Sequence, residues 1–366
     1  MIVFCHLLND RSGSPMVLCS SLAALNAREQ GVLYVGSQGR GVLDEADVMI
    51  KRYWYRRSRF RLITLFAFLI SQYRLYRALG KARLPEDAII YVNTLLPFGA
   101  AVWGRRNDRK VIYHIHEVSL SPRILQIFLV WVTRKTASLI MYVSEDNRAR
   151  VPVEGVTTSV IPNPVSDEVA LAGHSHRYEP RCSGKFEILM LASPRDFKGI
   201  PEFLELARRI SDRSEIRFRL VLNAEPHKVH RYLPASEIPD NLAIFPRSER
   251  PEDFYKQADL VLNLSRVDQW IETFGLTLVE AMSFGIPVIA PPVGGPSEII
   301  TDGEEGFLID SRDVDLLERK VRLLADNPDL LMRMSAKARR RASDFSFESF
   351  AARLREALAS VETAKA

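Results

Sequence analysis

The sequence predicts an α/β protein with two doubly wound parallel-sheet domains. Short apolar runs alternate with helical patterns along most of the chain, and such alternation is typical of parallel sheets. The alternation stops at a polar, irregular stretch, residues 172–183, and then begins again. The length agrees with two domains, because the chain has 366 residues and single hydrophobic cores stop growing near ~250–300 residues.

Each expected strand is a short apolar run bounded by polar or helical sequence. In the first half these runs are residues 2–8, 31–35, 88–92, 110–114 and 138–143, with a helix expected over 16–28. In the second half they are residues 186–191, 218–223, 242–245, 260–264, 287–290 and 307–309, with helices expected over 200–210, 273–284 and 347–361. The helix over 273–284 is expected to stop at Gly285, with Pro287 just beyond.

We therefore expect an N-terminal domain over residues 1–171, a linker over 172–183, a C-terminal domain over 184–345 and a closing helix over 346–366.

Composition excludes several classes of protein. Hydrophobic residues make up 47% of the chain, which is too many for a disordered protein. Cys5, Cys19 and Cys182 are too few and too scattered for a disulfide framework or a zinc cage, which favours a reducing compartment. We expect no signal peptide, because the first residues lack a basic segment and become polar early. The longest apolar runs, residues 62–70 and 124–132, are too short to span a membrane. We expect a cytoplasmic protein, soluble or peripheral to a membrane.

The net charge of +5 is distributed unevenly. No Asp or Glu occurs between Met49 and Pro85, and from Lys51 to Arg83 basic residues alternate with Trp, Tyr and Phe. Such a segment suits an interfacial helix on an anionic membrane. Two other interpretations stay open: a solvated basic helix whose apolar run is ordinary core, and a nucleic-acid patch.

The most informative stretch, residues 271–292, contains two glutamates. If the residues between Glu272 and Glu280 are helical, the two carboxylates lie roughly 12 Å apart along the axis. Acid and base pairs that cleave one glycosidic bond lie about 5–9.5 Å apart. We therefore expect Glu272 and Glu280 to hold two ends of one extended ligand, with a phosphate at the helix N-terminus near Gly275. The alternative is that Glu272 is only an N-terminal helix charge and that Glu280 is a solvated surface residue.

The setting ETFGLTLVEAMSFGIPVIA resembles the E-x7-E signature of the retaining nucleotide-sugar glycosyltransferases of family 4. LASPRDFKGIPEFLEL, at 191–206, is similar to the phosphate-binding strand–loop–helix of that family. YVSE at 142–145, VIPNP at 160–164, PVGGPSEIITDGEEGFLI at 292–309 and residues 345–347 resemble further parts of it. The resemblance implies the GT-B fold: two Rossmann-like domains facing across a cleft, with a C-terminal helix that returns to the N-terminal domain.

The resemblance also implies roles for individual residues. Glu272 would contact the donor sugar, with the backbone of Phe274, Gly275 and Leu276 near the sugar and diphosphate. Glu280 would hold the ribose hydroxyls, and Lys198 and Arg195 would neutralise the diphosphate.

In the N-terminal half, Gly13 occupies the first strand–helix loop, where the family usually has two adjacent glycines. His116 resembles the histidine that the family places near the reacting centre, with His114 and Glu117 as its support. The alternatives are a plain turn at Gly13 and a structural histidine at His116.

The family implies transfer of a hexosyl or deoxyhexosyl group with retention of configuration and without a metal or other cofactor. We expect a saccharide acceptor, lipid-linked on the cytoplasmic face of the inner membrane, in assembly of a surface polysaccharide such as lipopolysaccharide O-antigen or capsule. A soluble small-molecule acceptor is the alternative. A dinucleotide-dependent oxidoreductase ranks lower because no G-x-G-x-x-G follows an early strand. A nucleic-acid-binding protein would need no such glutamates, and we expect no nucleic-acid partner.

Overall fold

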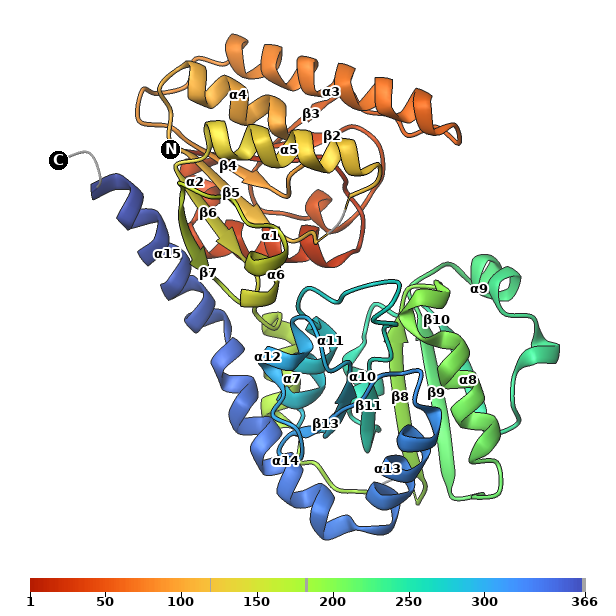
Figure 1. Ribbon diagram of the computed structural model, residues 1–366. Coiled ribbons are helices and arrows are strands. Elements are labelled where there is room, and N and C mark those ends of the chain that lie inside the picture. The colour runs from red at the N-terminus through yellow and green to blue at the C-terminus, as the bar shows by residue number, and fades with distance from the viewer. Residues whose placement is uncertain (119, 182–183, 364–366) are drawn as a thin grey trace. The chain divides into compact units, whose positions relative to one another are not determined.

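The computed structural model describes residues 1–118, 120–181 and 184–363 (Figure 1). Within these residues the chain forms two compact units: unit 1 is Met1–Pro164 with Phe347–Ala366, and unit 2 is Val165–Ser346. Each unit is built on one parallel sheet covered by helices, which confirms the predicted fold class. Among the described helices, none is both long enough and apolar enough to cross a membrane.

The sheet of unit 1 has seven strands among the described residues, all paired in parallel. Helices cover both faces, so β4, β5 and β6 are buried from end to end, as their continuous apolar runs predict. In spatial order the strands are β3 (Met49–Tyr53), β2 (Gly31–Gly36), β1 (Ile2–His6), β4 (Ile89–Asn93), β5 (Val111–Ile115), β6 (Leu139–Tyr142) and β7 (Thr157–Val160).

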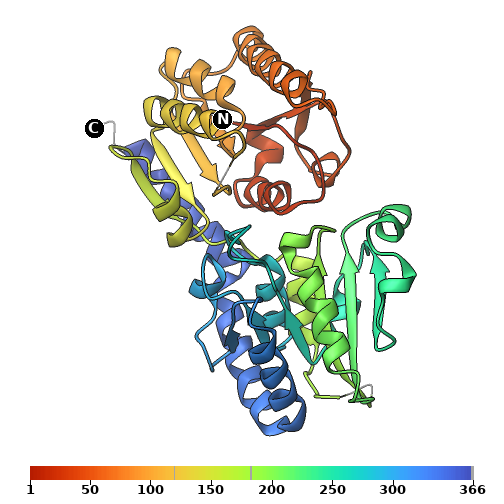
Figure 2. The same ribbon diagram turned by 45° about the vertical axis from the view of Figure 1, so that its right-hand side comes forward.

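Two layers of helices enclose this sheet, as both views show (Figures 1 and 2). One layer contains α3 (Arg61–Lys81), α4 (Phe98–Arg106) and α5 (Arg123–Thr136), and the other contains α1 (Gly13–Ala24) and α15 (Phe347–Thr363). Although α15 ends the described chain, its buried side chains share a core with those of α1. The C-terminal helix thus returns to the N-terminal unit. Two short helices complete unit 1: α2 (Ala27–Gln30) and α6 (Glu145–Arg150).

The sheet of unit 2 has six parallel strands among the described residues. In spatial order they are β10 (Leu242–Pro246), β9 (Ile216–Leu222), β8 (Phe186–Ala192), β11 (Leu260–Leu262), β12 (Val288–Ala290) and β13 (Gly306–Leu308). The helices of the unit are α7 (Asp167–Ser175), α8 (Ile200–Arg209), α9 (Pro226–Tyr232), α10 (Glu252–Tyr255), α11 (Leu276–Ser283), α12 (Pro296–Ile299), α13 (Val314–Asp326) and α14 (Pro328–Ala342).

The boundary between the units lies at Pro164 and Val165, before the stretch 172–183 that we expected to be the linker. Helix α7 extends to Ser175, and the Ser166 side chain caps its N-terminus. Tyr178 is buried in unit 2, where its hydroxyl donates to the Asp259 carbonyl at 2.7 Å. Polarity suggested a linker here, but the described part of the stretch, residues 172–181, is anchored in unit 2. Cys182 lies outside the described residues.

Two further predictions need correction. The helix expected from residue 273 begins at Leu276, because Gly275 adopts a left-handed backbone (φ 103°) that cannot continue a helix. The axial separation calculated for Glu272 and Glu280 therefore does not apply. The segment from Lys51 to Arg83 is not a single interfacial helix, since its first residues form the edge strand β3 and only Arg61–Lys81 are helical.

Candidate functional site

Both sheets reverse their strand order at one place, where β1 lies beside β4 in unit 1 and β8 lies beside β11 in unit 2. In open α/β sheets such switch points open a crevice at the carboxyl ends of the strands, where ligands bind. Several of the polar residues singled out in the sequence lie at these two points, Lys198 and Glu272 in unit 2 and His116 in unit 1.

In unit 2, the loop after β8 is held against the end of β11 by a glycine. Gly199 has a left-handed backbone (φ 82°), and a Cβ there would overlap the Leu264 carbonyl. Only glycine tolerates both conditions at low cost. This close approach brings the short 3₁₀ turn Asp196–Lys198 to the residues that follow β11. Lys198 therefore faces a second loop rather than open solvent.

Lys198 and Glu272 form the centre of the unit 2 cluster. The Lys198 ammonium donates to Glu272 Oε2 at 2.6 Å, and the Ser265 hydroxyl donates to the same oxygen at 3.1 Å. The two charged side chains are only 20% and 17% exposed. Burial alone would raise the pKa of the Glu272 carboxyl. The Lys198 charge and the hydrogen bonds from Lys198, Ser265 and Asn263 outweigh it and lower that pKa below its usual value. Glu272 is a carboxylate at neutral pH.

Two stacked aromatic side chains lie beside this ion pair. The Lys198 ammonium lies over the Trp270 ring, 5.3 Å from its centroid, and the Phe197 ring stacks on Trp270 at 5.1 Å. The Trp270 ring lies against the Lys198 ammonium and attracts it, and Phe197 supports that ring.

Two glycines fix the backbone that leads from Glu272 into α11. The Gly295 amide donates to the Glu272 carbonyl at 2.9 Å. A Cβ on Gly294 would overlap that carbonyl, and one on Gly295 would overlap Phe274 Cα. Phe274 is itself buried and packs against Phe345. The N-terminus of α11 is therefore held rigidly beside Glu272, and its free N–H groups and positive dipole end favour a phosphate.

Glu280 lies on α11 in a different environment from Glu272. It is buried, and the Tyr255 hydroxyl donates to its Oε2 at 2.7 Å. Burial raises the pKa of Glu280 to about 7, although the hydrogen bond from Tyr255 opposes this. The carboxyl can thus donate as well as accept a hydrogen bond near neutral pH, which suits a diol.

The other predicted residues of unit 2 lie close by in the chain. Leu276 is the first residue of α11, and Gly275 is its N-cap. Arg195 precedes the 3₁₀ turn that contains Lys198, and its side chain is exposed.

In unit 1, Asn93 joins three segments at the switch point. Its side-chain amide donates to the Ser14 carbonyl at 3.1 Å and lies 3.1 Å from His6 Nδ1. Its side-chain oxygen lies 2.9 Å from His116 Nε2, which is therefore the donor in that pair. Asn93 thus connects His116 with Ser14, the residue that follows Gly13.

Three histidines of this cluster are neutral. Burial lowers the pKa of His6 to about 4 and that of His114 to about 3. Burial, together with the neighbouring His114 and His6, lowers the pKa of His116 well below its ordinary value. The His114 and His116 rings lie 4.3 Å apart, and His114 Nδ1 is 2.8 Å from the Tyr91 hydroxyl. These imidazoles act here as hydrogen-bonding groups rather than as cations.

Two residues close to His116 have unusual properties: the backbone of one is strained, and the carboxyl pKa of the other is shifted. Thr94 has φ 74°, a conformation that is rare for a β-branched residue and that concentrates at functional sites. Beside it, burial raises the pKa of Glu117 to about 7, although hydrogen bonds from the His116 amide and the Thr94 side chain oppose this. Glu117 is therefore placed to take up or release a proton near neutral pH.

Gly13 begins α1, and a Cβ added there would meet no atom within 4 Å. Its backbone is not in the left-handed region. The space above it is open, so nothing within unit 1 requires glycine at this position.

Sequence reasoning missed Asn93, Thr94, His6, Ser265 and Trp270. A signal existed for two of them, because Asn93 and Ser265 are polar residues directly after buried apolar runs. No local pattern marks the left-handed Thr94. The contact between His6 and Asn93 requires the strand order of the folded sheet.

Residues 176–341 match the family model described as Glycosyl transferases group 1. The match lies within unit 2. A D-inositol 3-phosphate glycosyltransferase of Streptomyces coelicolor is 31% identical over 155 residues, which are 39% of this chain and 33% of that protein. Its counterpart from Thermobispora bispora is 33% identical over 159 residues, 40% of this chain and 36% of that protein. The matches span about a third of the length of these curated relatives.

Solved structures resemble the whole chain. Anabaena HepE in complex with UDP has a TM-score of 0.79 at 18% identity, covering 98% of this chain and 99% of that one. Sucrose-phosphate synthase from Thermosynechococcus elongatus has a TM-score of 0.76 at 16% identity, covering 100% of both chains. At these identities the likeness shows the fold, which is GT-B.

Proposed function

We propose that this protein is a retaining glycosyltransferase of family 4 that takes a hexosyl or deoxyhexosyl group from a nucleoside diphosphate sugar. The observation that supports this most directly is the Lys198–Glu272 pair at the switch point of unit 2, beside the N-terminus of α11. The family match of residues 176–341 covers these same residues. HepE, whose fold is similar, was crystallised with UDP, with UDP-glucose, and with UDP and glucose.

In this proposal, different residues of unit 2 bind different parts of the sugar donor. An ammonium has three N–H donors, so Lys198 can keep its hydrogen bond to Glu272 and also donate to an oxygen of the diphosphate. Arg195 adds a second cation, and the backbone at Phe274, Gly275 and Leu276 lies next to the sugar and diphosphate. The Glu272 carboxylate accepts hydrogen bonds from sugar hydroxyls, and Glu280 holds the ribose diol.

The chemistry follows from where charge develops. As the glycosidic bond to the diphosphate breaks, the leaving oxygen gains negative charge, and Lys198, Arg195 and the helix N-terminus stabilise it. That oxygen accepts the proton of the incoming acceptor hydroxyl on the same face of the sugar, which retains the configuration. We propose that these fixed charges act without a metal ion.

Unit 1 handles the acceptor in this proposal. His116 donates its one N–H to Asn93, so its Nδ1 can accept a hydrogen bond from a hydroxyl group, and Gly13 leaves open space for close approach. The acceptor class that the relatives favour is a small soluble molecule, because the curated relatives are named D-inositol 3-phosphate glycosyltransferases. A lipid-linked saccharide on the cytoplasmic face of a membrane is the second candidate, favoured by the exposed apolar side chains of α3.

The test is release of nucleoside diphosphate from a panel of UDP-, GDP- and dTDP-sugars. We expect Glu272→Gln to lower turnover on the order of 100-fold or more, because it removes a charge used in the transition state. Glu304→Gln, an exposed substitution in the same unit, is the matched control and should leave turnover unchanged. Activity should persist in EDTA.

Two outcomes would overturn the proposal: binding of no donor by the wild-type protein, or full turnover by Glu272→Gln. Extraction of labelled product into an organic phase would identify a lipid-linked acceptor, and retention in water a soluble one.

A further inference from the structure

The outer side of α3 carries an apolar stripe. Its members recur at spacings of one, three and four residues, so they lie along one face of the helix. The residues that pack on the sheet, including Phe68, Leu75 and Leu79, lie on the opposite face. Leu62 is 71% exposed. The stripe consists of Leu62, Ile63, Phe66, Leu69, Ile70 and Tyr73, all exposed.

A second stripe lies on the outer side of α5. Its exposed members are Ile124, Ile127, Phe128 and Trp131, again at helical spacing, and Ile124 is 80% exposed. Helix α5 lies on the same side of the sheet as α3 (Figure 1). Because the residues of both stripes are exposed, the stripes lie on the outer side of this helix layer.

The two stripes are neighbours. The Arg61 guanidinium at the start of α3 donates to the Ser121 hydroxyl just before α5, at 3.0 Å. Between the helices, the Phe98 ring of α4 contacts Phe68 of α3 and Phe128 of α5. We call the two stripes together the apolar face.

The charge around the apolar face has one sign. No Asp or Glu occurs between Met49 and Pro85 or between Val118 and Ser144, the two segments that contain α3 and α5. Basic residues stand among the rings: the Arg74 guanidinium lies over Trp54 at 5.1 Å, and that of Arg59 over Phe60 at 4.7 Å. An exposed apolar surface with cations and no acids matches an anionic, amphiphilic surface.

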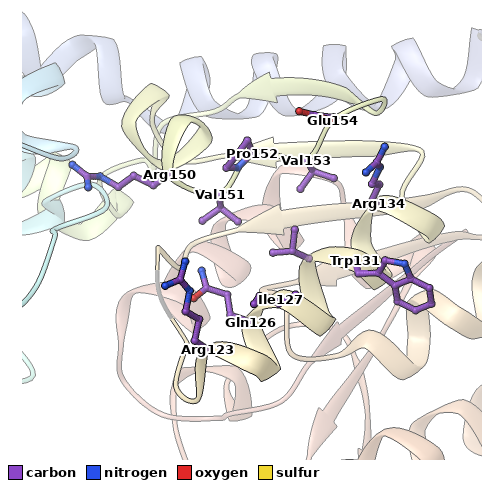
Figure 3. A pocket seen from close by; sticks show the side chains of 11 residues that line it. Arg123, Gln126, Ile127, Trp131, Arg134, Arg150, Val151, Pro152, Val153 and Glu154 are labelled. Carbon is purple, nitrogen blue, oxygen red and sulfur yellow. The ribbon is translucent and has the colours of Figure 1, made fainter.

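A pocket adjoins the apolar face at α5 (Figure 3). It has a volume of about 410 Å³ and shares Ile127 and Trp131 with the apolar face. Three guanidinium groups line it, those of Arg123, Arg134 and Arg150, together with one acidic residue, Glu154. Arg150 is paired with Asp146 at 2.6 Å, so the three cations outnumber the two acids. The pocket can hold a phosphate next to an apolar chain.

We propose that the apolar face lies on the surface of an anionic membrane, with the arginine-lined pocket at the level of the lipid phosphates. The charge decides between the possible occupants. A second copy of this chain would bring one basic face against another, whereas anionic lipid headgroups neutralise it. The inference goes beyond the proposed sugar transfer and does not depend on it, since binding to lipid requires no sugar donor.

Flotation of the full chain with vesicles tests this proposal. We expect the protein to float with vesicles of phosphatidylcholine containing phosphatidylglycerol, to float poorly with phosphatidylcholine alone, and to be released by salt. The variant Leu62→Glu with Phe66→Glu should lose roughly tenfold or more of the binding. The matched control is Leu171→Glu with Met332→Glu, two exposed apolar residues of unit 2.

Thermal unfolding followed by circular dichroism checks that both variants fold. The proposal is wrong if the wild-type protein does not float with anionic vesicles, or if the α3 variant floats as well as the control. It is also wrong if sedimentation shows a dimer that the α3 variant dissociates and the wild-type protein does not float, because a second copy then covers the apolar face.

Discussion

Single residues decide how closely the loops of the donor site approach one another. Gly199 permits contact between the loop after β8 and the residues after β11, and without it Lys198 would not reach Glu272. Gly294 and Gly295 do the same for the loop that supports the start of α11. At all three positions a side chain would overlap backbone atoms of the facing segment, which cannot move aside as a flexible side chain can.

Replacement of Gly199 by alanine should destabilise unit 2 more than backbone strain alone explains. The left-handed backbone costs alanine about 1–2 kcal/mol, and overlap with the Leu264 carbonyl adds to this. Gly303→Ala is the matched control, since Gly303 has φ 80° and no atom within 4 Å of an added Cβ. Urea unfolding measures both variants, and equal losses of unfolding free energy would show that the overlap relaxes without cost.

Sequence reasoning found the residues of the site that belong to a local motif. Lys198 and Glu272 were predicted to bind one donor, and the structure places them in contact. Asn93 was missed because its role comes from residues far along the chain, Ser14, His6 and His116, which meet only when β1, β4 and β5 pair. The local pattern names candidate side chains, but the strand order decides which of them meet.

At the scale of elements, burial explains which strands could be predicted. The central strands β4 and β5 are buried throughout and read as continuous apolar runs. The edge strands β3 and β7 are largely exposed or half-buried and contain polar residues, so their sequences resemble loops. The start of α11 was misplaced because an amphipathic pattern does not reveal the left-handed backbone of Gly275.

Helix α15 should be needed for the stability of unit 1 rather than unit 2. Leu354 is fully buried in the core that α15 shares with α1, so we expect Leu354→Ala to cost roughly 2–5 kcal/mol. Hydrogen exchange followed by mass spectrometry assigns the loss to a unit, with the half-exposed Leu323→Ala on α13 as control. Faster exchange confined to residues 165–346 would contradict the assignment of α15 to unit 1.

For the whole molecule, buried imidazoles and buried carboxyls should make stability depend on pH in opposite directions. Unit 1 buries neutral His6, His114 and His116, whose folded pKa values lie below the ordinary value of 6.5. The unfolded chain therefore protonates these imidazoles first as the pH falls, and they lower the stability of unit 1 from about pH 6.5 downward. Glu117 of the same unit, with a folded pKa of about 7, opposes this between about pH 7 and pH 4.5, so the loss from the imidazoles dominates below about pH 4.5. Unit 2 buries Glu280, whose folded pKa of about 7 lies above its ordinary value, so its contribution is full below about pH 4.5 and is lost as the pH rises to 7.

Hydrogen exchange measured between pH 4 and pH 8, corrected for intrinsic rates, separates these responses. Each unit of pKa difference corresponds to about 1.4 kcal/mol. His6→Gln should make unit 1 less sensitive to acid, and Glu280→Gln should flatten the response of unit 2. Equal acid sensitivity of unit 1 in the wild-type protein and in His6→Gln would refute the role of that imidazole.

The return of α15 to unit 1 has a consequence for biosynthesis. Unit 2 is continuous in the chain, from Val165 to Ser346, whereas unit 1 is interrupted by it. On the ribosome, unit 2 is fully synthesised before unit 1. Until α15 has been synthesised, the side of α1 that α15 covers stays exposed. Unit 2 can therefore complete its fold before unit 1, and chaperones that bind incomplete cores would bind unit 1 for longer.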